Sequence, residues 1–174
     1  GLLFERTRWR RRKGFSDRAI ELLVKQPAVN ARPKRWWIER GLLTRYALRN
    51  GNITLAYRLS RDHRQASGAS YAEAEWLAGW IALRYLREPH VARKHFQNLY
   101  ENVNYPVSRA RGAYWAGRAA EAGGANAAAM TWYRTAAKHV TTFYGQMADY
   151  YLPGSGSAQL PSEPAVSAQD EKKF

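Results

Sequence analysis

The chain has 174 residues, 45% of them apolar, which is enough for one domain with a buried core or for a short array of helical repeats. Its mean hydropathy of -0.61 and the lack of a long apolar run without charges argue against a membrane span. Cysteine is missing, so a disulfide framework, a thiolate nucleophile and a zinc–thiolate site are excluded. Lysine and arginine total 28 against 14 acidic residues, and this excess favours an anionic partner.

The positive charge is densest near the N-terminus. Residues 1–40 contain 12 basic and 4 acidic side chains, and half of these basic residues lie between Arg6 and Lys13. A solvated helix end is the simpler interpretation of this run, because cations near a helix C-terminus interact favourably with the helix dipole. The second interpretation is contact with a polyanion, for which the candidate residues are Arg10, Arg11, Arg12 and Lys13.

Hydrophobic periodicity and helix-ending residues predict helices along most of the chain, and no segment shows the alternating pattern of a strand. The fold class predicted from this pattern is all-α. In chain order, the predicted helices span residues 2–13, 16–26, 36–50, 53–66, 70–86, 89–103, 107–122, 125–138 and 141–151.

An internal repeat groups these helices into pairs. Four alanines follow one another at intervals of 36 or 37 residues: Ala19, Ala56, Ala92 and Ala129. Five positions before each alanine stands a predicted helix break, at Gly14, Gly51, Arg87 and Gly124. Glycine readily takes the left-handed backbone that ends a helix, and Arg87 is followed closely by a proline that can open the next one. Helix pairs at this period are typical of tetratricopeptide-like solenoids, so residues 1–152 are predicted to form a superhelical stack of helix pairs, an α-solenoid.

The segment 70–86 shows how one of these helices is expected to be built. Ser70 and Glu73 match a capping box, which would begin the helix at this point. A single buried stripe is predicted from the helical spacing of Trp76, Trp80 and Leu83. Small residues are expected where neighbouring helices approach closely, as at Gly79 and Gly117.

After Leu152 the composition changes to glycine, serine and proline, which cannot bury enough apolar surface to fold. Residues 153–174 are therefore predicted to be a flexible linker. The first residues, Gly1 to Phe4, and the last, Asp170 to Phe174, do not look like natural ends, so we expect the chain to be part of a larger protein.

No residue pattern of an enzyme active site stands out. The histidines have no metal-ligand spacing and are interpreted as ordinary surface or half-buried residues: His63, His90, His95 and His139. Glu73 and Glu75 point to different faces of a helix, so they are interpreted as a cap and a solvated charge rather than as an acid and base pair. A Gly-x-Ser-x-Gly elbow and a phosphate loop are also missing. No catalytic residue, metal or cofactor is predicted.

Two segments in the second half of the chain carry a resemblance to a known family. They are Tyr114-Trp115-Ala116-Gly117-Arg118-Ala119 and Phe143-Tyr144-Gly145-Gln146. Together with Ala74-Glu75-Trp76-Leu77-Ala78-Gly79-Trp80, they resemble the helical arm of soluble lytic murein transglycosylases, and the resemblance covers most of residues 4–152.

The resemblance implies a periplasmic enzyme family that cleaves the bond between N-acetylmuramic acid and N-acetylglucosamine and leaves a 1,6-anhydro sugar. The family uses one glutamate in a Glu-Ser motif of a lysozyme-like domain, and no glutamate here is followed by serine. The chain is therefore expected to be a non-catalytic arm, inactive alone, whose linker leads to a missing catalytic domain. Its expected partners are peptidoglycan, that catalytic domain and other cell-wall proteins.

Aromatic residues beside arginines can stack on sugars, and the candidate ligand-binding residues are Arg111, Tyr114, Arg118 and Tyr144. Aromatics at helical spacing inside a repeat more often belong to the core. Two other functions stay open. The chain can be a tetratricopeptide-like scaffold for protein interactions, since this fold class hosts many functions. An RNA-binding repeat is permitted by the basic charge but lacks polar code positions, so no nucleic-acid partner is expected.

Overall fold

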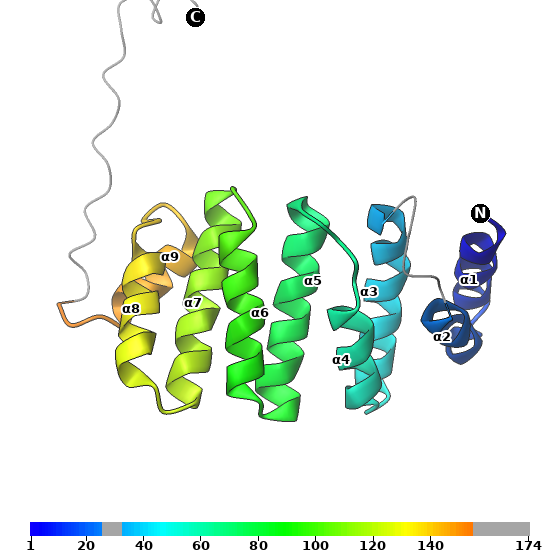
Figure 1. The fold of residues 1–174 in the computed structure, drawn as a ribbon, viewed down its shortest axis with the longest axis horizontal. Helices are drawn as coiled ribbons and strands as arrows, with labels where there is room; N and C mark the ends of the chain where they lie inside the picture. The colour runs from blue at the N-terminus through cyan, green and yellow to red at the C-terminus, as the bar shows by residue number, and fades with distance from the viewer. Residues whose placement is uncertain (26–32, 155–174) are drawn as a thin grey trace, which may run out of the picture.

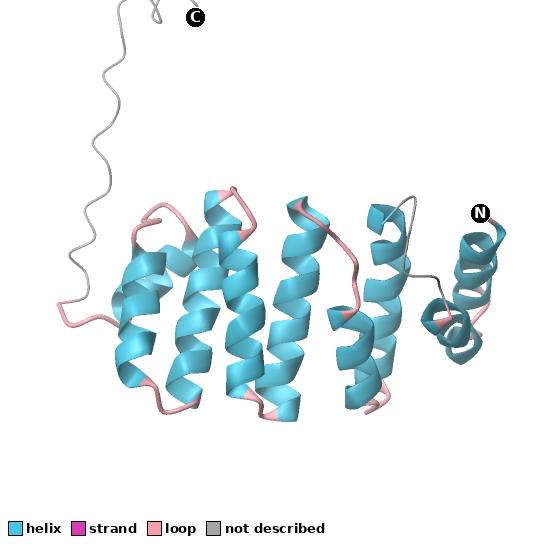
Figure 2. Ribbon diagram, in the orientation of Figure 1, coloured by secondary structure: helices cyan, strands magenta, loops and turns pink. Residues whose placement is uncertain are grey.

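The computed structural model describes residues 1–25 and 33–154, and every regular element in these ranges is helical (Figure 2). The all-α prediction is confirmed. In chain order, the elements are α1 (Leu2–Arg12), α2 (Ser16–Val24), α3 (Pro33–Arg49), α4 (Ile53–Arg61), α5 (Gly68–Ile81), the short π-helix η1 (Ala82–Leu86), α6 (Pro89–Glu101), α7 (Pro106–Ala122), α8 (Asn126–Ala137) and α9 (Phe143–Tyr150).

The helices lie in a row that follows the order of the chain, from α1 at one end to α8 and α9 at the other (Figure 1). Each helix contacts the next one, and the alternate pairs α1–α3, α3–α5 and α7–α9 also touch. The buried apolar residues form successive clusters along this row, one around Leu43 and Leu59 and another around Tyr133. Each helix therefore buries its apolar face against near neighbours in the chain. The tetratricopeptide-like superhelix remains a prediction.

Left-handed residues make the turns within the helix pairs, as predicted for the three glycines of the repeat. Gly14, Gly51, Arg87 and Gly124 all have positive φ angles. Arg87 is the informative case, because φ is 57° although it carries a side chain. The chain accepts this conformation where the Glu88 amide donates to the Ala82 carbonyl at 2.9 Å and Pro89 starts α6.

The end of α4 differs from the sequence prediction, which extends this helix to residue 66. α4 ends at Arg61 because the following residues form a loop with its own hydrogen bonds. The Gln65 amide donates to His63 Nδ1 at 2.9 Å, and the Gln65 side chain donates to the Pro33 carbonyl at 2.8 Å. These bonds compete successfully with continuation of the helix.

The predicted capping box at Ser70 and Glu73 is wrong. α5 begins earlier, at Gly68, and its N-cap residue makes no side-chain capping bond. The Glu73 carboxylate instead accepts hydrogen bonds from Trp37 Nε1 at 3.0 Å and Arg45 Nη2 at 2.8 Å. Glu73 therefore joins α3 to α5.

The tryptophans of α5 are less buried than their spacing predicts. Trp76, Trp80 and Leu83 are half-buried, and the two indole rings stack with centroids 6.0 Å apart. The fully buried face of this helix consists of smaller residues: Ala74, Leu77, Ala78 and Ile81.

Close helix packing depends on glycine at several positions, Gly79 and Gly117 among them. A Cβ atom on Gly79 would lie 2.7 Å from the Phe96 ring, and one on Gly117 would lie 2.6 Å from the Tyr133 ring. Both rings are fully buried. The predicted close approach of helices at Gly79 and Gly117 is confirmed.

None of the helices within 1–25 and 33–154 combines the length and hydrophobicity needed to cross a membrane. Of the predicted linker 153–174, Pro153 and Gly154 follow α9 in a turn, and the remainder lies outside the described residues, as does residue 26 of the predicted second helix.

Replacing Gly117 by leucine should destabilise the protein, because the new side chain would have to displace the buried Tyr133 ring. Overpacking of this kind costs up to about 3 kcal/mol, which corresponds to a melting temperature lower by roughly 6 to 12 °C. Thermal unfolding followed by circular dichroism measures the change. Ala122→Leu, at an exposed position of the same helix, is the control and should leave the melting temperature nearly unchanged. Equal melting temperatures for Gly117→Leu and Ala122→Leu would contradict the packing described.

Candidate functional site

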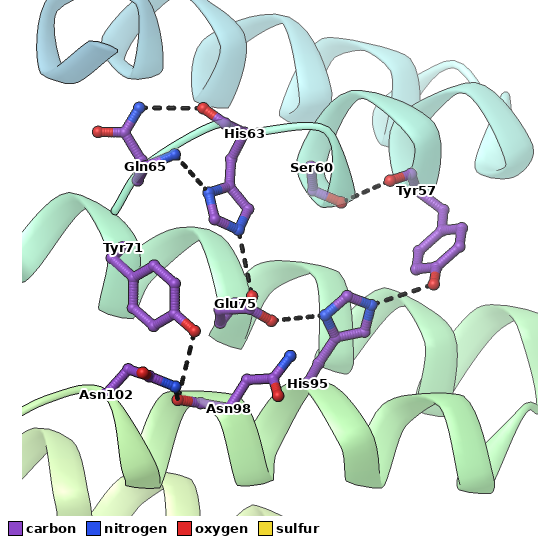
Figure 3. A network of polar contacts seen from close by, with 9 residues as sticks. All are labelled: Tyr57, Ser60, His63, Gln65, Tyr71, Glu75, His95, Asn98 and Asn102. Atoms are coloured by element: carbon purple, nitrogen blue, oxygen red, sulfur yellow. Dashed lines mark hydrogen bonds and ion pairs between the residues drawn. The ribbon is translucent and has the colours of Figure 1, made fainter. Parts of the chain in front are cut away.

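A buried carboxylate at the middle of the row is bound by two histidines from other elements. Glu75 on α5 accepts a hydrogen bond from His95 of α6 between Nδ1 and Oε2, at 2.6 Å. Its other oxygen, Oε1, lies 3.2 Å from Nε2 of His63 in the loop after α4. The phenol of Tyr57 on α4 lies 3.0 Å from His95 Nε2 and extends the network (Figure 3). Four side chains thus join α4, its following loop, α5 and α6.

The hydrogen bonds determine the tautomer of His63. His63 Nδ1 accepts from the Gln65 amide, so its proton resides on Nε2 and is donated to Glu75. His95 donates from Nδ1 to Glu75, and its Nε2 pairs with the Tyr57 hydroxyl. Both nitrogens of each ring are therefore engaged in hydrogen bonds.

Burial alone would raise the pKa of Glu75, but the hydrogen bonds from His63 and His95 outweigh it and lower this pKa from 4.5 to about 2. Tyr71 packs edge-on against His63 with ring centroids 5.5 Å apart, and its hydroxyl donates to the Asn98 carbonyl at 3.4 Å. Burial, together with the negative charge of Glu75, raises the pKa of Tyr71 to about 12. The carboxylate is ionised and the phenol neutral throughout the physiological range.

This network holds helices together and is not arranged for catalysis. Both oxygens of Glu75 already accept hydrogen bonds, and its side chain is only 8% exposed, so neither oxygen is placed to exchange a proton with a substrate. In the part of the chain that the structure describes, no group of histidines and carboxylates has an arrangement that could hold a metal ion.

The sequence analysis misses this network, and the interpretation of Glu75 as a solvated charge is wrong. Its partners are 12 and 20 residues away, and no local pattern connects them. The sequence of α5 does contain a signal that Glu75 is buried. Glu75 lies between Ala74 and the apolar residues Trp76, Leu77 and Ala78, where an ionised group needs a partner.

Three of the four candidate ligand-binding residues lie together at the junction of α7 and α9. The rings of Tyr114 and Tyr144 have centroids 5.4 Å apart, and Arg118 Nη1 donates to the Tyr114 hydroxyl at 3.2 Å. Arg118 also donates to the Tyr151 hydroxyl at 3.0 Å. Tyr114 is buried, whereas Arg118 and Tyr144 are half-buried. Tyr114 therefore belongs to the core, and the other two border the surface.

The fourth candidate, Arg111, lies against α5. Its guanidinium carbon is 5.3 Å from the centre of the Trp76 ring, and Nη2 lies 3.5 Å from the Ala72 carbonyl. Burial lowers the pKa of Arg111. Arg111 Nε, Trp76 Nε1 and Trp115 Nε1 are buried without a hydrogen-bond acceptor among the described residues. These donors lie in one neighbourhood, since the Trp76 and Trp115 rings are 6.3 Å apart.

The basic run near the N-terminus divides between two roles. Arg11 makes a bidentate contact with the buried carboxylate of Glu39 on α3, through Nε and Nη2. Arg10 donates from Nη1 to the Arg18 carbonyl at 3.0 Å. Arg12 and Lys13 are exposed. Of the four candidate polyanion contacts, Arg11 is therefore a structural residue, and the other three remain accessible.

The chain matches no protein-family model, no curated protein and no solved structure. The inference of function therefore depends on the residues and on the contacts described above.

Replacing Glu75 by glutamine should lower the free energy of unfolding by about 2 kcal/mol at pH 7, because the buried histidines lose a charged acceptor. The folded-state pKa of about 2 lies below the ordinary value of 4.5, so ionised Glu75 stabilises the folded protein above pH 4.5. This contribution is lost as the pH falls from 4.5 toward 2, so the free energies of unfolding of the wild-type protein and the variant should converge over this interval. Urea unfolding at a series of pH values measures the difference.

Glu21→Gln is the matched control, since Glu21 is exposed on α2. Its free energy of unfolding should equal that of the wild-type protein at every pH. If the difference in free energy of unfolding between Glu75→Gln and the wild-type protein does not change between pH 4.5 and 2, the role assigned to the carboxylate is contradicted.

Proposed function

We propose that this chain is the non-catalytic helical-repeat arm of a peptidoglycan lytic transglycosylase. In this proposal residues 1–152 form a tetratricopeptide-like superhelix that positions peptidoglycan or partner proteins, and residues 153–174 link it to a catalytic domain of the same parent protein. The parent enzyme is a bacterial periplasmic lyase of the cell wall, which cleaves between N-acetylmuramic acid and N-acetylglucosamine to give 1,6-anhydro products.

The observation that carries the proposal is the pair of segments at residues 114–119 and 143–146, which resemble this family. They lie on α7 and α9, which pack against each other, and Tyr114 contacts Tyr144. The small residues of the motif have physical roles, because Gly117 admits the Tyr133 ring and Gly145 is buried and donates to the Thr142 hydroxyl at 3.0 Å. The row of helix pairs with left-handed turns supports the superhelix.

The helices α5, α7 and α9 supply side chains suited to a glycan with acidic peptides. Half-buried rings such as Trp76, Trp80 and Tyr144 provide apolar faces for sugars, and arginines recognise carboxylates with two parallel hydrogen bonds. This combination of side chains supports binding of a glycan rather than catalysis.

The state of the glutamates supports an arm without its own activity. A lytic transglycosylase needs one glutamate that first donates and then accepts a proton. The two buried glutamates among the described residues, Glu39 and Glu75, are held by Arg11 and by two histidines. Neither can reach a glycosidic oxygen.

The second candidate function is a scaffold that binds other proteins. Large aromatic side chains are exposed at Tyr105, Phe143 and Tyr150, by 69%, 68% and 76%, and exposed aromatics of this kind are enriched at protein interfaces. A helical-repeat scaffold would bind a protein partner and show no preference for sacculi.

Incubation of the chain with purified sacculi should release no 1,6-anhydro-muropeptides, because no glutamate of the sequence is followed by serine, as the catalytic motif of this family requires. Mass spectrometry of the soluble fraction measures the products, and an active lytic transglycosylase is the positive control. Anhydro products above the level of a buffer blank would show that the chain contains an active site.

Binding to sacculi should persist in part as the salt concentration approaches ~1 M, where the Debye length is about 3 Å, while binding to RNA should be lost. The triple variant Arg10→Gln, Arg12→Gln and Lys13→Gln should weaken RNA binding and leave most sacculus binding at high salt. It keeps Arg11, whose loss would leave the Glu39 carboxylate unpaired in the core. Co-sedimentation with sacculi and filter binding with RNA measure the two interactions.

The matched control carries the same loss of charge at exposed positions on other helices: Arg49→Gln, Lys94→Gln and Lys138→Gln. If salt reduces sacculus binding to the same extent in the wild-type protein and in both triple variants, the binding is a charge effect only. This result would favour the scaffold. RNA binding that survives high salt and prefers one sequence would overturn the transglycosylase proposal.

A further inference from the structure

A pocket of about 270 Å³ lies between α1 and α3 near the N-terminal end of the row. It is lined by four arginines, one glutamate and two apolar side chains: Arg8, Arg11, Arg12, Arg35, Glu39, Phe4 and Ile38. We infer that this pocket binds a small ligand that combines a doubly charged oxyanion, a phosphate monoester, with an apolar portion the size of one ring. Binding here does not require that the parent protein act on peptidoglycan.

The charges of the pocket are not balanced by the residues that the structure describes. Glu39 is engaged by Arg11 through two hydrogen bonds and compensates that guanidinium. Arg35 pairs with Glu5 at 2.9 Å, but both side chains are substantially exposed, and such pairs exchange readily with other anions. Arg8 and Arg12 make no ion pair and no hydrogen bond to the described residues. An excess of positive charge therefore faces the pocket.

The placement of Arg8 and Arg12 strengthens this point. They are four residues apart on α1, so their side chains are neighbours on one face of the helix and repel each other. Arg11 lies beside them and is held in place by Glu39. An anion between Arg8 and Arg12 would remove the repulsion, and a dianion would match both guanidinium groups at once.

The apolar side chains of the pocket define the part of the ligand that carries no charge. Phe4 is buried, packs edge-on against Trp36 with ring centroids 5.0 Å apart, and is covered on one face by the Arg35 guanidinium at 4.4 Å. Ile38 is 61% exposed at the opening and can be covered by a ligand. The volume is close to the lower limit of roughly 300 Å³ for small-molecule sites, so it fits a single ring with one phosphate group.

Isothermal titration calorimetry of the 174-residue chain with four probes tests this inference: phenyl phosphate, inorganic phosphate, phenylacetate and phenol. Phenyl phosphate should bind with one-to-one stoichiometry and with a dissociation constant at least about tenfold lower than that of inorganic phosphate, because the ring adds apolar contact with Phe4 and Ile38. Phenylacetate should bind more weakly than phenyl phosphate, and phenol should show no saturable binding.

The double variant Arg8→Gln and Arg12→Gln should raise the dissociation constant of phenyl phosphate at least about tenfold. The matched control, Arg6→Gln and Lys25→Gln, removes the same charge from exposed residues that do not line the pocket and should stay within about twofold of the wild-type protein at 0.15 M salt, where the Debye length is about 8 Å. Melting temperatures show whether each variant is folded.

Loss of phenyl phosphate binding by both variants to the same extent would overturn the pocket as the site. The absence of saturable binding to the wild-type protein would overturn the inference entirely. Phenylacetate binding as tightly as phenyl phosphate would overturn the assignment of a dianion.

Discussion

The burial of one ionised carboxylate, that of Glu75, is the constraint on which the middle of the structure depends. An unpaired charge in an apolar core is strongly unfavourable, so the helices can close around Glu75 only when both of its oxygens are satisfied. The partners come from the loop after α4 and from α6, and Tyr57 of α4 extends the contact through His95. Apolar packing alone would permit small shifts of one helix past another, whereas these directional bonds specify one arrangement.

Charged or polar contacts also join alternate helices along the row. Arg11 binds Glu39 between α1 and α3, and Trp37 and Arg45 bind Glu73 between α3 and α5. At the other end Arg118 of α7 binds the hydroxyl of Tyr151, the residue that directly follows α9. A charged or polar contact of this type thus accompanies each of the contacts α1–α3, α3–α5 and α7–α9. Glycines at the close approaches add a steric requirement, since Gly79 and Gly117 exclude a larger side chain.

Features that depend on neighbouring residues could be predicted from the sequence, whereas contacts between residues far apart in the chain could not. Helix starts and left-handed turns arise from neighbouring residues, and the turns at Gly14, Gly51, Arg87 and Gly124 were all predicted. Glu39 and Glu75 bind partners 28, 12 and 20 residues away, and a single sequence contains no pattern that connects them. The error at Glu73 has the same origin, because the capping pattern is local whereas the partners of Glu73, Trp37 and Arg45, lie on α3. Of the candidate ligand-binding residues, Tyr114, Arg118 and Tyr144 could be grouped from the sequence, but the burial of Tyr114 required the packing of α7 against α9.

The number of basic residues, 28, overstates the number of cations available to a partner. Arg11 pairs with Glu39, Arg45 pairs with Glu73, and Arg111 lies against Trp76. Arg40 is buried and donates to the Leu59 carbonyl, and burial lowers its pKa to about 10. Salt screens exposed charges strongly and buried pairs much less. Raising the ionic strength should therefore remove polyanions from exposed residues such as Arg12 and Lys13 while the internal contacts survive, which means that binding observed at high salt reports on shape and on apolar contact with a protein that is still folded.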